Sequence, residues 1–331
     1  MRVPMLVSAF AALAAVCASP LPAQAQAPLK KITFLTNYTF HGRHSPFFVG
    51  LDKGYYRDAG FDIQISPATG SGFVITAVDS GKADYGMAEA GPVVQAVAKG
   101  AKVKAFMVFT DISTSGLASL KPYKTLDSLK GQRIAASQTD SARVILPILL
   151  ERSKIDPASI NWLAADPGVY SSLLLSGQTD LFTASIDGDI PALEKVAKPR
   201  GKEVYFAPFA DWGYDVFGYF LIAKDTTLAN DPAAAKRFAE ATRKAVDYAV
   251  AHPEETAKIM VKHNPALNYD TTLAQWQQTI KSIETPYVKK NGYGVATDER
   301  MQRTIDLVET AMKLDAKLGA KDLYMPALSG R

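Results

Sequence analysis

The sequence has little cysteine and few of the patterns that mark catalytic or metal-binding proteins. Its one cysteine, Cys17, lies in an apolar stretch near the N-terminus, so the rest of the chain can form no disulfide and offers no thiolate. The four histidines lack the spacing of a zinc site, and there is no Gly-x-Ser-x-Gly sequence. We therefore predict a protein that is not an enzyme and needs no cofactor or metal ion.

Concentrated charge of one sign is also missing. The formal net charge is +4, and Lys and Arg form no cluster beyond pairs such as Lys30-Lys31 and Lys289-Lys290. Proteins that bind nucleic acid normally concentrate basic residues on one face. We therefore exclude nucleic acid from the expected partners and assign these charges to a solvated surface.

Long apolar runs are limited to the N-terminus. The stretch 5–18 is apolar apart from one serine, follows a basic residue, and leads through two prolines to small residues that end at Ala25. This pattern is typical of a secretory signal peptide, so we predict cleavage of residues 1–25 and export to a bacterial periplasm. The run is short for a membrane span, and Val16 replaces the small residue that a lipid-bearing Cys17 would need.

One five-residue phrase occurs twice. Residues 80–84, Ser-Gly-Lys-Ala-Asp, recur at 176–180 as Ser-Gly-Gln-Thr-Asp. Each copy ends a helical stretch at a glycine that can adopt a left-handed conformation, and each precedes a short strand followed by an acid, Glu89 or Asp187. The alternatives are coincidence and a repeated α/β lobe.

Strand-like and helix-like segments alternate along most of the chain, which predicts α/β architecture with helices on both faces of each sheet. We predict lobe one over 28–118, lobe two over 119–215, and a return to lobe one over 216–331. The chain would then cross twice, near 119–123 and 212–218, forming a hinge beside a ligand cleft.

The last third of the chain is expected to be helical and to pack on lobe one. The predicted helices cover residues 232–251, 253–263, 271–283 and 298–318. Asp231 and Asp298 are suitable N-caps, and Pro232 suits a first helical position.

The loop after the first predicted strand carries an amide, an aromatic ring and two imidazoles. Because ligands of open α/β sheets bind beyond the carboxyl ends of strands, we expect ligand contact from Asn37, Tyr38 or His44. A surface turn is the alternative. A metal site at His41 and His44 would lack a third nearby ligand.

Two further loops end at predicted helix starts, where free backbone N–H groups can bind a ligand. Gly70 and Ser71 form one such turn, and Ser137 and Thr139 lie in its counterpart in lobe two. For the second loop, simple capping by Asp140 is an equally good interpretation.

Two acids and two aromatic residues complete the candidate ligand-binding set. Glu89 and Asp187 would be unfavourable in a closing cleft unless they meet a cation, an N–H donor or water, which favours an amino-bearing solute; exposure at the rim is the alternative. Trp212 and Tyr214 lie at the second crossing, where stacking on the solute and hinge packing explain them equally well.

Several phrases together carry a family resemblance. Residues 47–56, 59–63, 80–86 and 129–134 resemble the corresponding segments of exported solute-binding proteins of ABC importers, in the group that handles sulfonates, nitrate and thiamine-pyrimidine precursors. The resemblance implies a two-lobed periplasmic-binding-protein fold of type II. It also implies a monomer that captures a small organic solute and delivers it to an ABC transporter permease.

The thiamine-precursor branch is the most informative part of this resemblance. Its histidine, which lies shortly before the apolar helix, corresponds to His44, whereas its Asp and Trp correspond to Asn37 and Tyr38. A flat nitrogen heterocycle is therefore expected, but not that precursor itself. The related pyrimidine-synthesising proteins carry a cysteine-rich signature that is absent here, which argues against their enzymatic role. Three alternatives stay open: an anion of the sulfonate or nitrate type, a receptor that feeds a membrane sensor, and an exported enzyme that uses His44 with Glu89 or Asp187.

Overall fold

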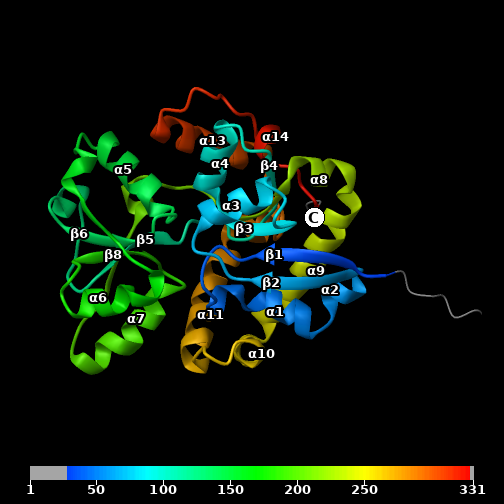
Figure 1. Cartoon of the computed structure of the whole chain (residues 1–331), viewed down its shortest axis with the longest axis horizontal. Coiled ribbons are helices and arrows are strands. Elements are labelled where there is room, and N and C mark those ends of the chain that lie inside the picture. The colour runs from blue at the N-terminus through cyan, green and yellow to red at the C-terminus, as the bar shows by residue number, and fades with distance from the viewer. Residues whose placement is uncertain (1–27, 329–331) are drawn as a thin grey trace, which may run out of the picture.

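The computed structural model describes residues 28–328, which form two lobes, each built on a five-stranded sheet (Figure 1). Sheet one has the order β2 (Phe61–Ser66), β1 (Lys30–Leu35), β3 (Tyr85–Glu89), β10 (Tyr219–Lys224), β4 (Val103–Val108). Sheet two has the order β7 (Asn161–Ala164), β6 (Arg133–Ala136), β8 (Leu181–Ser185), β5 (Ser115–Ser119), β9 (Tyr205–Pro208). The predicted α/β class with two lobes is confirmed.

The two sheets share one topology. In each sheet the first three strands in this order are parallel, and the last two pairings are antiparallel. The fourth strand in each order, β10 or β5, is the first strand that the chain forms after it has crossed from the other lobe. The carboxyl ends of the parallel strands of both sheets therefore face the space between the lobes.

The repeated phrase forms the same turn in both lobes. Gly81 has φ 74° and Gly177 has φ 73°, the left-handed conformation that glycine adopts without strain. The carboxylates of Asp84 and Asp180 then each accept a hydrogen bond from a backbone N–H of the neighbouring strand, that of Thr33 at 2.8 Å and that of Arg133 at 2.9 Å. The repeat therefore marks a duplicated structural unit.

Helices cover both faces of each sheet. Lobe one has α1 (Ser45–Asp52), α2 (Tyr55–Asp58), α3 (Ser71–Asp79) and α4 (Ala90–Ala98); lobe two has α5 (Ala142–Arg152), α6 (Tyr170–Leu175) and α7 (Asp189–Ala197). After β10 follow α8 (Asp225–Asn230), α9 (Pro232–Ala251), α10 (Pro253–His263), α11 (Tyr269–Ile283), α12 (Pro286–Asn291), α13 (Asp298–Met312) and α14 (Ala320–Leu323).

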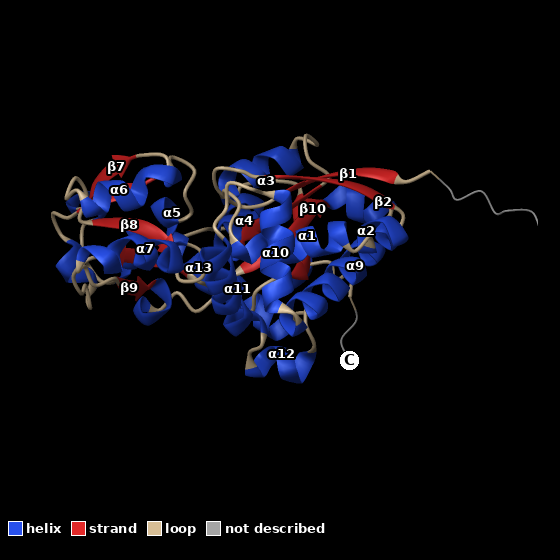
Figure 2. Ribbon diagram, turned by 90° about the horizontal axis from the view of Figure 1, so that it is seen from below, coloured by secondary structure: helices blue, strands red, loops and turns tan. Residues whose placement is uncertain are grey.

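These C-terminal helices return to lobe one, as the sequence predicted. Helices α9 and α10 pack on α1, and α13 packs on α4. Phe238 of α9 lies 4.7 Å from the Tyr85 ring and 5.9 Å from the Phe34 ring, measured between centroids, so it closes the core beneath sheet one. Helix α11 also contacts α7 of lobe two, and it lies at the boundary of the lobes in Figure 2.

The chain passes between the two sheets twice. The first is the segment 109–114 between β4 and β5, and the second is 209–218 between β9 and β10. The first crossing therefore precedes the predicted range 119–123. The reason is that β5, with the sequence Ser-Gly-Leu-Ala-Ser, lacks the β-branched and aromatic residues that indicate a strand.

Local signals located α9, α10 and α11 to within two residues, whereas α13 ends at Met312 and not at 318. Asp231 caps α9 by accepting from the N–H of Ala234 at 3.0 Å. For α13 the N-cap is Thr297, which accepts from the N–H of Arg300, so Asp298 lies in the first turn instead. None of the described helices is both long and apolar enough to cross a membrane. The expected signal peptide lies outside the described residues.

Candidate functional site

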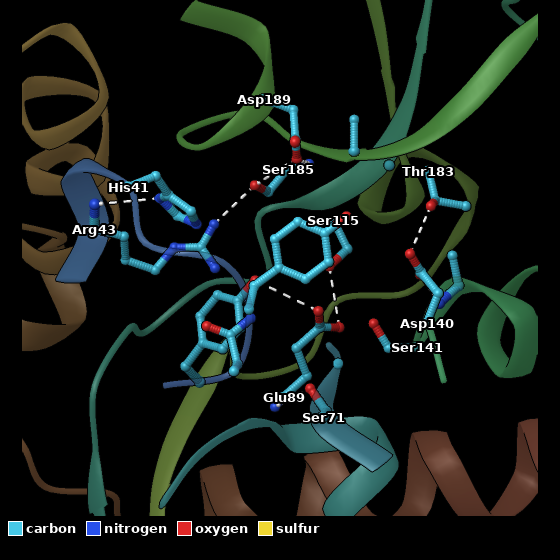
Figure 3. A pocket seen from close by; sticks show the side chains of 17 residues that line it. His41, Arg43, Ser71, Glu89, Ser115, Asp140, Ser141, Thr183, Ser185 and Asp189 are labelled. Atoms are coloured by element: carbon cyan, nitrogen blue, oxygen red, sulfur yellow. Dashed lines mark hydrogen bonds between the residues drawn. The ribbon is translucent and has the colours of Figure 1, made fainter. Parts of the chain in front are cut away.

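A cavity lies between the lobes at the carboxyl ends of the strands (Figure 3). It contains about 470 Å³ of empty space, its open mouth included. Lobe one contributes Asn37, Tyr38, His41, Arg43, Gly70, Ser71, Glu89 and Tyr219 to its lining. Lobe two contributes Ser115, Gly116, Asp140, Ser141, Ala142, Thr183, Ala184, Ser185 and Asp189. Solute held here would touch both lobes.

A buried ion pair joins the lobes at one end of this cavity. Arg43, in the 3-10 turn η1 (Gly42–His44), donates from Nε and Nη2 to the two carboxylate oxygens of Asp187, at 2.8 and 2.6 Å. Thr279 of α11 also donates to Asp187, at 3.0 Å. Both charged side chains are almost completely buried, at 1% and 0% exposure. Asp187 does not line the cavity, because both of its carboxylate oxygens are bound by Arg43.

Two buried histidines organise the loop that follows β1. Burial lowers the pKa of His44 and of His41 well below the ordinary value, so both rings are neutral. His44 Nδ1 lies 3.4 Å from the backbone N–H of His41, and His44 Nε2 lies 3.1 Å from Asn37 Oδ1. In the tautomer that satisfies both contacts, Nε2 donates to Asn37. His44 therefore orients the Asn37 amide from behind and does not itself line the cavity.

Three carboxyl groups face the cavity, and none of the described residues pairs them with a cation. Burial raises the pKa of Glu89 to about 7 and that of Asp189 to about 6, and it raises the pKa of Asp140 as well. Among the described lining residues Arg43 is the one cationic side chain, and its charge is neutralised by Asp187. The cavity therefore has an excess of carboxyl groups.

Each of these carboxyl groups is held by short polar contacts. Glu89 accepts from Ser115 at 3.1 Å, across the lobe boundary, and from Tyr219 at 3.4 Å. Asp140 accepts from Thr183 at 2.7 Å and from the N–H of Ala142 at 2.9 Å. Asp189 accepts from the N–H and the hydroxyl of Ser185. These contacts fix the direction of each carboxyl group toward the cavity (Figure 3).

The loops at the helix starts contact each other across the cleft. Ser137 and Thr139 of lobe two both donate to the carbonyl of Thr69 in lobe one, at 3.2 and 3.1 Å. A Cβ at Gly70 would lie 2.4 Å from the Thr139 carbonyl oxygen, so this approach requires a glycine. Gly70 and Ser71 line the cavity, whereas the hydroxyls of Ser137 and Thr139 form hydrogen bonds between the two lobes.

The two aromatic residues predicted at the second crossing lie away from the cavity lining. Trp212 lines a separate pocket with Leu126 and Ile155. Tyr214 is buried, and a Cβ at Gly91 would collide with its hydroxyl, so Tyr214 packs the hinge. Tyr38 is the aromatic side chain of the predicted set that reaches the cavity.

Sequence reasoning missed Arg43, Ser115, Asp189 and Tyr219. Asp189 begins α7, two positions after a predicted acid, and its place at a strand end was a usable signal. Arg43 lies between the two histidines that were considered, but its partner is 144 positions away in the chain. No local pattern indicates such a pair. Within the described residues, no group of three or more His, Cys, Asp or Glu side chains could hold a metal ion.

A family model matches residues 41–256, a range that includes η1, both crossings and all of sheet two. The chain belongs to the NMT1/THI5-like family. This bears out the resemblance drawn from the sequence, to the group that includes thiamine-precursor proteins.

A curated relative shows how far this family extends. The 4-amino-5-hydroxymethyl-2-methylpyrimidine phosphate synthase of Candida albicans is 27% identical over 286 residues, which cover 81% of this chain and 84% of that protein. Similarly named synthases of Saccharomyces cerevisiae match over 80% of the chain. The prediction that this family member is not an enzyme is contradicted by these relatives. The absent cysteine-rich signature was a poor guide, because the similarity covers most of the chain without it.

Solved structures show the fold. A protein of Bordetella bronchiseptica RB50 superposes with a TM-score of 0.73 at 17% identity, covering 89% of this chain and 94% of that one. The alkanesulfonate-binding protein SsuA of Xanthomonas axonopodis pv. citri, bound to MOPS, superposes with a TM-score of 0.66 at 15% identity, covering 91% and 99%. The predicted periplasmic-binding-protein fold is confirmed.

Proposed function

We propose that this protein captures a small, flat, amino-bearing heterocycle between its lobes. The observation that carries the proposal is the set of three carboxyl groups, Glu89, Asp140 and Asp189, that face one cavity without a paired cation. A solute that supplies N–H donors or a positive charge would stabilise their ionised forms. The Tyr38 ring offers an aromatic surface against which a flat solute can stack.

The same carboxyl groups oppose the alternative of an anionic solute. A sulfonate or a phosphate in this cavity would add negative charge beside carboxyl groups that burial already makes hard to ionise. The fungal relatives are named for an aminopyrimidine phosphate, and the unphosphorylated aminopyrimidine has the features that this cavity selects. We therefore favour 4-amino-5-hydroxymethyl-2-methylpyrimidine as the first compound to test, which reverses the expectation drawn from Asn37 and Tyr38 that the solute is not this precursor.

Isothermal titration calorimetry can test this proposal with three compounds. The aminopyrimidine is expected to bind at least about tenfold more tightly than its phosphate ester and than MOPS. Glu89→Gln should weaken aminopyrimidine binding about 10- to 100-fold, since a hydrogen bond to a charged group is lost. Glu254→Gln, an exposed acid on α10, is the matched control and should leave affinity unchanged. Tighter binding of MOPS than of the aminopyrimidine would overturn the proposal.

Delivery to a membrane permease of an ABC importer is the second half of the proposal, together with a periplasmic location. The support is the fold, which is shared with a sulfonate-binding protein, and the expected signal peptide. Uptake of labelled aminopyrimidine by cells with and without the gene would test it. Unchanged uptake in a strain that makes no other receptor for the compound would count against delivery.

The names of the fungal relatives favour a second candidate function, a reaction on a pyrimidine in the same cavity. The Glu89 carboxyl, with a pKa of about 7, is suited to donating and accepting a proton near neutral pH. The alternative pair of His44 with Asp187 is less suited, because neither side chain lines the cavity. Mass spectrometry of the compound after long incubation with the protein distinguishes turnover from capture, and Glu89→Gln shows whether turnover depends on this site.

A further inference from the structure

The guanidinium of Arg43 is incompletely bonded within the protein. Its Nε and Nη2 donate to Asp187, and Nη2 also lies 2.8 Å from the Ser185 hydroxyl. Its third nitrogen, Nη1, is buried and makes no hydrogen bond to any of the described residues. A buried donor without a partner is unfavourable by about 1–3 kcal/mol, so native structures rarely retain one without a role.

The position of this guanidinium connects the free donor to the cavity. Arg43 is part of the lining, and its guanidinium points into the pocket in Figure 3. One face of the group lies 4.1 Å from the centre of the Tyr219 ring, which limits its rotation. Since Asp187 holds the other two nitrogens, the direction of Nη1 is fixed.

We propose that Arg43 Nη1 donates a hydrogen bond to an acceptor atom of the solute, and that the solute therefore carries an acceptor beside its N–H donors. An aminopyrimidine, with ring nitrogens next to an exocyclic amine, belongs to this class; an amine without ring acceptors does not. This inference rests on the proposed function and adds to it a second recognition element, opposite in sign to the carboxyl groups.

This donor is assembled from both lobes. Arg43 belongs to lobe one, whereas Ser185 and Asp187, which orient its guanidinium, belong to lobe two. When the lobes separate, the guanidinium loses these partners, and Nη1 loses its direction. The bond to the solute therefore strengthens the closed form over the open form, which is the differential affinity that a solute needs to close the lobes.

Two ligands of one shape test the acceptor. 4-Amino-2-methylpyrimidine and 3-methylaniline have the same ring size and substituents, but only the pyrimidine has ring acceptors. At about pH 8 both are uncharged, so a difference in affinity reports the acceptor. The wild-type protein is expected to prefer the pyrimidine at least about tenfold, the effect of one well-placed hydrogen bond.

The variant must remove the whole ion pair, because Arg43→Met alone would leave a buried carboxylate and could unfold the protein. In the double variant Arg43→Met/Asp187→Leu we expect the preference for the pyrimidine to fall to within about twofold. The matched control is Arg133→Met/Asp180→Asn, which removes an exposed Arg–Asp pair of similar bidentate geometry in lobe two. That control should retain the wild-type preference.

The outcomes separate this inference from the proposed function. If the wild-type protein binds both ligands equally, or the double variant keeps the wild-type preference, the acceptor contact is wrong while the amino-binding cavity stands. If the wild-type protein binds neither ligand, the proposed function fails and the inference falls with it. If the wild-type protein and the control prefer the pyrimidine and the double variant does not, the result supports both the acceptor contact and the proposed function.

Discussion

The two lobes share one framework, but an arginine near the first helix start of each lobe has a different role in each. In sheet one Phe34 of β1 pairs with Tyr85, and in sheet two Ile134 of β6 pairs with Leu181, so β1 and β6 occupy the same place in their sheets. Each of these strands is followed by an arginine near the start of the next helix: Arg43 lies in η1, just before α1, and Arg143 is the second residue of α5. Arg143 donates to the carbonyls of residues 136 and 137 at the end of its own strand, whereas Arg43 crosses to the other lobe. A duplicated scaffold thus does not imply a duplicated site.

The acidic residues at the strand ends also differ in position and in role between the lobes. The repeated turns align Glu89, the last residue of β3, with Ser185, the last residue of β8. Asp187 lies two positions further along and binds Arg43, so it is not the counterpart of Glu89. Lobe one presents its carboxyl from the strand end itself, while lobe two presents Asp189 from the start of a helix.

The largest expected effect is a difference in the free energy of unfolding between variants of Arg43 and Arg143. Arg43→Met leaves Asp187 as an uncompensated buried carboxylate, and we expect the free energy of unfolding to fall by about 3–5 kcal/mol. Arg143→Met removes two hydrogen bonds from a half-buried side chain, and we expect a loss of about 1–2 kcal/mol. Urea unfolding followed by tryptophan fluorescence measures both.

The double variant Arg43→Met/Asp187→Leu is the control for this comparison. Because it removes both buried charges, it should recover most of the stability lost by Arg43→Met. Equal losses for Arg43→Met and Arg143→Met would show that the ion pair between the lobes is no more important than the contacts within lobe two.

The second largest effect is expected in the pH dependence of stability, which should distinguish the strand end at Glu89 from the equivalent strand end at Ser185. The pKa of Glu89 is raised by burial from its ordinary value to about 7, so the folded, unliganded protein binds more protons than the unfolded chain between about pH 5 and pH 7. The contribution of Glu89 to stability is therefore largest in acid and is lost as the pH rises through this window. The equivalent Ser185 does not titrate.

Thermal unfolding across this pH range, without ligand, measures that slope. Glu89→Gln should reduce this slope and leave the contributions of Asp189, whose pKa is about 6, and of Asp140. Addition of an amino-bearing ligand should give the opposite trend, because the ionised carboxylate binds it better; the ligand-induced rise in Tm should increase with pH. Identical slopes for the wild-type protein and Glu89→Gln would contradict the assignment.

Local patterns predicted the framework, because the framework is built from local interactions. Strand and helix periodicity, the proline and Asp231 at the start of α9, and the repeated turn each depend on residues a few positions apart. Strand β5 was missed because its five residues are stabilised by neighbours on both sides in the sheet and not by their own propensity.

The candidate site was only partly accessible to the same reasoning. The rule that ligands bind at strand ends led to Asn37, Tyr38, Gly70, Ser71 and Glu89, which the structure places in the cavity lining. Whether they contact a solute stays a prediction. The pairing of Arg43 with Asp187 depends on how the lobes meet, which no spacing in the sequence expresses.

The smallest expected effect concerns the repeated turn, a feature that the two lobes have in common. Gly81 and Gly177 have nearly the same positive φ, and a Cβ at either position would meet no other atom within 4 Å. Gly81→Ala and Gly177→Ala should therefore each reduce the free energy of unfolding by about 1–2 kcal/mol through backbone strain alone. The two losses should agree to within about 0.5 kcal/mol and add in the double variant, since the turns lie in different lobes. A much larger loss at one glycine would mean that the two turns, despite their common sequence and geometry, support their lobes unequally.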